Sequence, residues 1–529
     1  MQRVVFVIGN AKLWLCSALL IFCPPAMAGA ADSGSPVVQA VAAARTHNSA
    51  NQGRIVHEFV ELLALRNVAS NHADMRRNAE FIMEMMRRRG VESRLLEAPG
   101  SPPVVFGELN RGAAHTVLIY AHYDGQPVQR ELWASDPWQP VLRKGRLEDN
   151  AATVDLGSLP AEIPGEWRLY ARSAGDDKAP IIGLLSAIDA LAAADIPVSV
   201  NLKFFFDGEE EAGSPHLADM IRRHANLLQA DFWLFCDGPV HQTRRQLVSF
   251  GVRGITGADI TVYGPLRQLH SGHYGNWAPN PVMMLVHLLA SMRAPDGEIL
   301  IDGFAEAVAE PSAEALAAIA AAPPVDEFLR KDFALGWTEG SGQRLERLIM
   351  NPAINVRGIR AGGVGKTARN AIADQATAAL GFRLVPDLTP ARVQALVDAH
   401  IRKQGYTIVR EPPDSQTLGQ HEKVALVEWR EYGYPAVWMD MNDLRAQAIS
   451  RILLQATDGE LVRMPTMGGS LPLHVIRQGL GVPIVMLPMA NHDNNQHSPN
   501  ENLRMQNLWD AIEIYAAVLA GLGAELARQ

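Results

Sequence analysis

The sequence predicts an α/β protein in which one domain has a mostly parallel central sheet flanked by helices and a second, α+β domain is inserted into it. Apolar strand-like runs alternate with helical runs over residues 117–235, and this alternation resumes near residue 432. From about residue 247, runs that alternate between polar and apolar residues predict a different kind of sheet. A chain of 529 residues with 48% hydrophobic residues is long enough for both domains.

Residues 1–28 are expected to be a signal peptide, because a basic start, an apolar run over residues 13–23 and a small-x-small site ending at Ala28 follow one another. Pro24 and its neighbour end the run short of the about 20 residues that a membrane span needs. We therefore expect export to a periplasm or out of the cell, without a stable membrane anchor. Residues 29–53, rich in Ala, Ser, Gly and Asn, are expected to be a flexible joint.

Residues 54–246 and 412–529 are expected to form the two parts of the first domain. Helices are expected at residues 55–65, 75–86, 181–193, 217–228 and 469–478, and strands at residues 117–120, 202–206, 232–235, 436–439 and 482–487. Because strands and helices alternate, most of these strands are expected to lie parallel.

Residues 247–411 are expected to form the inserted α+β domain. Strands are expected at residues 255–262 and 371–385, and helices at residues 281–292 and 390–402. The borders at residues 247 and 411 are placed where the pattern of apolar and polar residues changes.

The charge of the chain argues against a nucleic-acid partner. It has 48 basic and 57 acidic residues, a formal net charge of −9 that falls to −11 when the two basic residues of the expected signal peptide are removed. Two of the three cysteines lie in that signal peptide, so Cys236 is expected to stand alone and form no disulfide within the mature chain. It ends an apolar run, which is typical of a packed residue and not of a nucleophile.

Acidic and histidine residues follow several of the predicted strands at their carboxyl ends, where ligands collect in open α/β sheets. They are His122, Asp124, Asp176, Asp177, Glu209, Glu210, Glu211, Asp237 and His497. Carboxylates drawn into one cleft repel one another, and no Lys or Arg cluster lies beside them, so a pair of divalent cations would supply the balancing charge. Imidazole and carboxylate ligands together suit zinc, with manganese or cobalt as alternatives.

Two other kinds of motif would indicate a different chemistry. The stretch GGVGKT, residues 362–367, looks like part of a phosphate-binding loop, but Arg360 stands where that loop needs a glycine and a strand-like run follows in place of a helix. The Gly-x-Ser-x-Gly motif of serine hydrolases does not occur. Neither chemistry is expected.

The motifs resemble those of the co-catalytic di-zinc amidohydrolases, which include acetylornithine deacetylase, succinyl-diaminopimelate desuccinylase, glutamate carboxypeptidase and the carnosinase-type dipeptidases. The matching stretches, in order, are VLIYAHYDGQPV, WASDPWQP, SAGDDKAP, DGEEEAGS, CDGP, LHSGHYG, IDGF, FRLVPDLTP, MGGSLP and HSPNE. The carnosinase-like branch fits best because of HYDGQPV, RLVP and GGS. The sequence departs from the family pattern at Ala179 and Asn276, where glycines are common, which puts the shape of the substrate in doubt more than the reaction.

The resemblance implies a role for each residue of the metal site. One metal would be bound by His122 and Asp237, the other by Glu211 and His497, and both by Asp176. Asp124 would hydrogen-bond the His122 ring, and Glu210 would be the general base that takes a proton from the water molecule at the metal.

The resemblance also implies a homodimer formed through the inserted domain, which would act as a dimerisation or lid domain. His270 would reach the partner's substrate and stabilise the developing oxyanion. Asn370, Arg383, Gly469 and Ser470 would hold the carbonyl and the free C-terminal carboxylate of a small peptide.

The resulting prediction is an exported di-zinc exopeptidase that hydrolyses dipeptides or removes the C-terminal residue of short peptides. An N-acyl amino acid amidohydrolase on the same scaffold is the alternative within catalysis, because its substrates carry the same free carboxylate. A non-catalytic peptide-binding protein is the alternative from another class, and the loss of ligands or of the base that would mark it is not seen.

Overall fold

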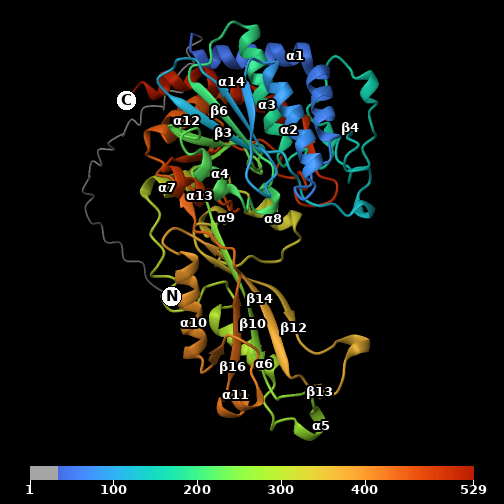
Figure 1. Ribbon diagram of the computed structural model, residues 1–529, viewed down its shortest axis with the longest axis vertical. Coiled ribbons are helices and arrows are strands. Elements are labelled where there is room, and N and C mark those ends of the chain that lie inside the picture. Colours follow the sequence, from blue (N-terminus) through green and yellow to red (C-terminus); the bar gives the residue numbers. More distant parts are fainter. Residues whose placement is uncertain (1–33, 529) are drawn as a thin grey trace, which may run out of the picture.

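The computed structural model describes residues 34–528, so the expected signal peptide lies outside the described residues. The molecule is elongated, with a helix-covered sheet at one end and a second sheet of long strands at the other (Figure 1). Among the described residues, none of the helices is long and apolar enough to cross a membrane. The mixed α/β fold class predicted from the sequence is confirmed.

The larger sheet has eight strands in the order β1-β2-β6-β3-β7-β19-β8-β18. Their bounds are β1 Glu92–Leu96, β2 Val104–Leu109, β3 Thr116–His122, β6 Asn201–Asp207, β7 Phe232–Phe235, β8 Leu247–Ser249, β18 Val462–Met464 and β19 Ile484–Met486. The central strands β6, β3, β7 and β19 pair in parallel, whereas β1 with β2, β2 with β6 and β8 with β19 are antiparallel. The parallel strands therefore bring their carboxyl ends to one edge.

Both faces of this sheet are buried, because alternate residues of β3, β6 and β7 enter two different cores. One core is covered by α1 Pro36–Leu63, α3 Lys178–Ala193, α12 Leu444–Ala456 and α14 Met505–Leu526, and the other by α4 Leu217–His224 and α13 Leu473–Leu480. Helix α2 His72–Arg87 packs on β1 and β2. Cys236 is buried in the first core, as expected of a packed residue.

The flexible joint expected over residues 29–53 is helical from Pro36 onward, where α1 begins. The alanines that suggested a linker are strong helix formers, and Ala40 and Ala44 are fully buried. Both belong to the core in which α1 packs against α14 and α3, so this part of the chain is not a linker.

The second sheet has five strands in the order β12-β14-β10-β16-β15. Their bounds are β10 Gly254–Tyr263, β12 Ala353–Arg360, β14 Gln375–Leu384, β15 Thr407–Val409 and β16 Val424–Trp429. Helices α6 Pro281–Met292 and α10 Pro390–Lys403 contribute to the core on one face of this sheet. Strand β16 lies beyond residue 411, so the sheet extends past the border expected for the inserted domain, because β16 pairs with both β10 and β15.

A helical segment, residues 313–350, comprises α7 Ala313–Ala321, α8 Asp326–Asp332 and α9 Leu345–Leu348. Although it falls inside the expected insertion, it packs on the edge of the eight-stranded sheet. Ala322 and Ile349 contact the core formed with β8 and β18, and Glu314 lies 3.1 Å from Arg463. Figure 1 shows α7 and α9 next to the eight-stranded end of the molecule.

The remaining elements are short. They are β4 Val141–Arg143, β5 Arg168–Tyr170, β9 Gly251–Val252, β11 Leu269–His270, β13 Ala371–Ile372, β17 Val437–Trp438, β20 Asn502–Arg504, α5 Ser271–Tyr274 and α11 Ser415–Gln420, with single 3-10 turns at Arg130–Leu132, Leu156–Ser158, Glu210–Ala212 and Gly365–Thr367. Strands β4, β5 and β20 form a small antiparallel sheet whose connections carry Asp176 and His497.

Candidate metal centre

His122 is the last residue of β3, and its imidazole is fully buried. Its Nδ1 lies 3.3 Å from Asp124 Oδ1, and its Nε2 lies 3.0 Å from Asp176 Oδ1. The backbone N–H groups of Glu210 and Glu211 donate to the two oxygens of Asp124 at 3.1 and 3.0 Å. Asp124 therefore connects the histidine ring to the acidic loop that follows β6.

Asp176 lies between the two histidines. Its Oδ2 is 3.1 Å from His497 Nε2, and Gln496 Nε2 donates to the same oxygen at 3.0 Å. The same His497 nitrogen is 3.1 Å from Glu211 Oε2. The peptide bond between Asp176 and Asp177 is cis.

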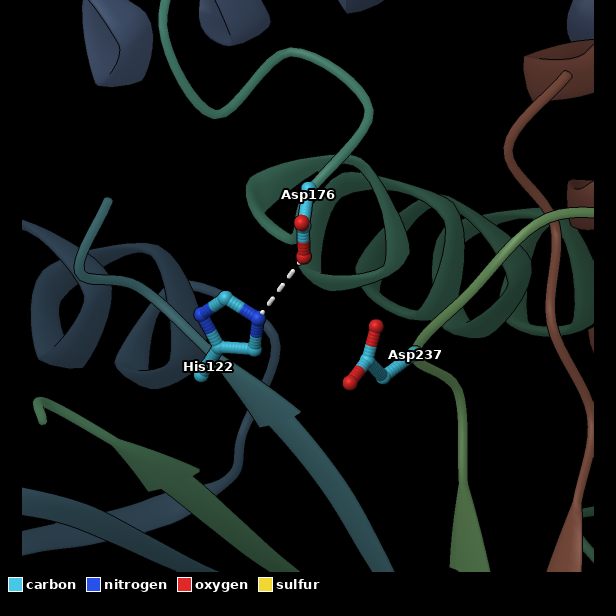
Figure 2. A group of neighbouring side chains, drawn as sticks. All are labelled: His122, Asp176 and Asp237. Atoms are coloured by element: carbon cyan, nitrogen blue, oxygen red, sulfur yellow. Dashed lines mark hydrogen bonds and ion pairs between the residues drawn. The ribbon is translucent and has the colours of Figure 1, made fainter. Parts of the chain in front are cut away.

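Two groups of side chains could each hold a metal ion, and Asp176 belongs to both. The first is His122, Asp176 and Asp237, and the second is Asp176, Glu211 and His497; within each group the possible ligand atoms lie within 4.8 Å of one another. Figure 2 shows Asp176 and Asp237 facing His122 across the end of β3. The structure thus brings together the five residues for which the sequence predicts metal binding.

The electrostatics of this group favour bound cations. Burial raises the pKa of Asp237 to about 7, and the Asp176 charge adds to the rise. Burial also raises the pKa of Glu210, with Asp237 and Glu211 adding to it and His122 opposing it. Hydrogen bonds to Asp176 and Glu211 raise the pKa of His497 to about 11. Divalent cations between these carboxylates would offset the repulsion, and the donor set of imidazole and carboxylate fits them.

Glu501, in the HSPNE stretch, has a structural role that the sequence did not indicate. It is fully buried, and its Oε2 accepts from Arg172 Nη1 at 2.8 Å and from the Ser173 backbone N–H at 2.9 Å. Its Oε1 accepts from the backbone N–H groups of Gly175 and Asp176, both at 2.9 Å. Glu501 therefore holds the loop that carries the shared carboxylate.

Gln126 was likewise missed, although it lies within the HYDGQPV stretch. Its Nε2 donates to Glu211 Oε2 at 2.7 Å. Its position four residues after His122 was the only signal in the sequence that it reaches the site.

Of the residues expected to bind the substrate, Arg383, Gly469 and Ser470 line a cavity of about 600 Å³ that also reaches the candidate metal ligands. Arg383 Nη1 donates to Ser470 Oγ at 2.6 Å. Burial, with the Arg383 charge adding to it, lowers the pKa of the neighbouring Arg253 to about 10. Arg383 supplies the positive charge at this end of the cavity.

His270 and Asn370 lie elsewhere. Both are exposed. His270 ends β11, and Asn370 directly precedes β13, which pairs with β11. The Ser271 backbone N–H donates to Asn370 O at 3.0 Å. Figure 1 shows α5 and β13 at the end of the molecule farthest from the eight-stranded sheet. Within one chain, the structure does not bring these two residues to the metal ligands.

Comparisons with known proteins agree on a family. Residues 118–521 match the family model described as "Peptidase family M20/M25/M40". The Cys-Gly metallodipeptidase of Schizosaccharomyces pombe is 28% identical over 432 residues, which cover 80% of this chain and 83% of that protein. The β-Ala-His dipeptidase of Homo sapiens is 24% identical over 429 residues, which cover 79% of this chain and 76% of that protein.

A solved structure gives the same result. The M20 family metallo-carboxypeptidase of Sulfolobus solfataricus matches with a TM-score of 0.70 and 26% identity, over 89% of this chain and 99% of that one. The family resemblance expected from the motifs is confirmed. The prediction of export to a periplasm or out of the cell is contradicted by the yeast relatives, the Cys-Gly metallodipeptidases of Schizosaccharomyces pombe and Saccharomyces cerevisiae, which are cytosolic enzymes.

Proposed function

Because the chain belongs to peptidase family M20/M25/M40 and is a peptide-bond hydrolase, we propose that it cleaves dipeptides or removes the C-terminal residue of short peptides. The observation that carries this proposal is the pair of ligand groups that share Asp176, with Glu210 beside them and outside both groups. Glu210 Oε2 lies 3.8 Å from His122 Nε2. A carboxylate so placed and not used as a ligand is free to move a proton.

Two divalent cations would be held by the two groups, one by His122 and Asp237, the other by Glu211 and His497, with Asp176 between them. Zinc suits these ligands best, with manganese or cobalt as alternatives. When bound, the cations would polarise the scissile carbonyl and lower the pKa of a water molecule.

Glu210 would take a proton from the attacking water and return it to the leaving amine, which is the work of a general base and then a general acid. Asp124 supports this step from two sides, since it contacts the His122 ring and accepts the backbone N–H of Glu210 itself. The positions of ligand and base are thereby coupled through one buried side chain.

Arg383 would bind the free C-terminal carboxylate of the substrate, helped by Ser470 and the adjacent Gly469. A guanidinium matches a carboxylate in shape and charge. The 2.6 Å contact between Arg383 and Ser470 holds the guanidinium at the cavity wall.

We also propose that two copies of the chain form the active unit through the five-stranded domain, so that His270 and Asn370 act on the partner's substrate. Strand β12 is an edge strand, and Ile359 on it is 54% exposed. On α6, Met283 is 50% exposed. Exposed apolar side chains on an unpaired edge are typical of an interface.

The dimer is tested with Ile359→Glu and Met283→Glu combined. We expect a monomer by light scattering and a large loss of dipeptidase activity, because His270 would no longer reach a substrate. A fully active monomer would contradict the role of His270 across the interface.

The reaction is tested with Glu210→Gln, which keeps the side-chain volume and removes the base. We expect a fall of about 100-fold to 10,000-fold in kcat with metal content unchanged. Glu148→Gln, at a side chain 51% exposed, is the control and should keep full activity. Full activity of Glu210→Gln with metal bound would contradict the assignment of the base.

Hydrolysis of N-acyl amino acids is the alternative, because the pair Arg383 and Ser470 would serve their carboxylate equally well. Rates on unblocked dipeptides and on N-acetyl amino acids separate the two activities. Faster cleavage of the acetylated compounds would replace the dipeptidase assignment.

A further inference from the structure

The cavity beside the metal ligands continues into an apolar part. Beyond Arg383 and Ser470, its lining includes Val240, Leu247, Leu345, Ile349, Met464 and Met467. A total volume of about 600 Å³ is within the usual range for small-molecule sites. The space is therefore large enough for a substrate side chain as well as for the peptide backbone.

Two of these side chains come from the helical segment, residues 313–350, and not from the eight-stranded sheet. Leu345 and Ile349 are only half-buried, and both line the cavity. Ile349 also packs on the core formed by Leu247 and Met464, which joins the two walls of the apolar part.

Arg344 fixes the position of the cavity wall that Leu345 and Ile349 form. Its Nη1 donates to Ile319 O at 3.0 Å, its Nη2 donates to Ala322 O and Pro323 O at 2.9 and 3.1 Å, and its Nε donates to Glu346 Oε2 at 3.2 Å. The Leu345 backbone N–H donates to Asp326 Oδ1 at 2.9 Å. A wall fixed in this way needs little reordering when a ligand binds.

The lining of this part of the cavity also includes one uncharged imidazole, His241, and one acidic side chain, Glu346. Burial lowers the pKa of His241 to about 4, so its imidazole is neutral at pH 7, and its Nδ1 accepts from the Thr243 backbone N–H at 3.3 Å. Glu346 is paired with Arg344 through one oxygen, while Oε1 has no hydrogen-bond partner among the described residues. An acidic substrate side chain would be repelled there.

We infer that the apolar part of the cavity binds a bulky aliphatic or aromatic side chain of the substrate, with Leu345 as a specificity-determining residue. This inference rests on the proposed peptidase function and names its substrate class. Burying a Leu or Phe side chain favours binding enough to raise kcat/KM by about 10-fold to 100-fold over glycine. Dipeptides with Asp or Glu at that position are expected to be poor substrates.

The experiment measures kcat/KM of the metal-loaded protein on two dipeptide series, Xaa-Gly and Gly-Xaa, with Xaa as Gly, Ala, Leu, Phe or Glu. Leu345→Ala is expected to lower the Phe-to-Gly ratio in the preferred series by about 3-fold to 10-fold, because it removes part of the apolar wall. Leu348→Ala, on the same helix and also half-buried, is the matched control because Leu348 lines a different cavity. It should leave the ratio unchanged.

Calorimetry gives a second test, which compares the affinity of Phe-containing dipeptides for Glu210→Gln with and without Leu345→Ala. Thermal unfolding checks that each variant is folded. A preference for Leu or Phe in either series, reduced by Leu345→Ala alone, supports the inference. Equal rates for Gly and Phe in both series, or equal effects of the two alanine variants, would overturn it while leaving the peptidase function standing. If neither a dipeptide nor the C-terminal bond of a short peptide is cleaved, the proposed function itself fails.

Discussion

Glu501→Gln is expected to destabilise the protein strongly, although it changes one atom of a side chain far from the solvent. The carboxylate accepts four hydrogen bonds at 2.8 to 2.9 Å, one from Arg172 and three from backbone N–H groups. A glutamine has one oxygen, so its amide N–H₂ would face two donors. The two donors that face the amide N–H₂ would then have no hydrogen-bond acceptor in the interior.

The cost can be worked from these contacts. Arg172 is 2% exposed, and removing the charge opposite a buried arginine costs about 3–5 kcal/mol. Because Glu501 also holds the backbone N–H of Asp176, we expect metal affinity to fall by about 10-fold to 100-fold.

The assay is urea unfolding of the metal-free protein at pH 8, together with zinc titration of the folded protein. Burial raises the pKa of Glu501 to about 7, so the carboxylate is ionised at that pH. Glu148→Gln, in an exposed ion pair, should change the free energy of unfolding by less than about 0.5 kcal/mol. A loss below about 1 kcal/mol for Glu501→Gln, with unchanged zinc affinity, would refute the reasoning.

Stability of the metal-free protein is expected to fall as the pH is lowered from 6.5 to 4, because burial lowers the pKa of His241 to about 4 and the unfolded chain therefore takes up the proton first. His241→Gln should remove about 3 kcal/mol of the difference between pH 7 and pH 4 in urea unfolding, and an unchanged pH profile would contradict this. Zinc at about 1,000 times its Kd should stabilise the metal-free protein by about 4 kcal/mol in thermal unfolding, whereas Asp237→Asn should lose much of that gain; equal gains would remove Asp237 from the ligands. Ala44→Asp, which buries a charge in the core beneath α1, should cost about 3–5 kcal/mol, and Ala42→Asp, at an exposed site on the same helix, should be nearly neutral; equal effects would show that the start of α1 does not pack.

The candidate metal ligands could be predicted from the sequence because their positions follow from topology. A parallel strand delivers the residue after it to one edge of the sheet, so His122 and Asp237 meet although they are far apart in the chain. The motifs then assigned each residue a role by resemblance. Local pattern and family motif pointed to the same edge, which is where the structure has the cluster.

Other features depend on tertiary contacts that a local pattern does not contain. The alanine-rich stretch before residue 53 has the composition of a linker, and it is helical because it packs in the same core as α14. The helical segment lies inside the insertion by sequence but packs on β18, because its apolar residues fit that sheet edge. Glu501 gains its importance only from four hydrogen-bond donors that lie far from it in the sequence.

The separate origins of the cavity walls have a consequence for how relatives can diverge. All five candidate metal ligands lie in the eight-stranded domain, whereas Leu345 and Ile349 reach the same cavity from residues 313–350. Mutations in that stretch can widen, narrow or recharge the pocket without displacing a ligand. Substrate range and catalytic residues can thus evolve on separate parts of one chain. Replacing residues 313–350 with the corresponding stretch of a relative would be a direct way to change the substrate range while keeping the metal ligands.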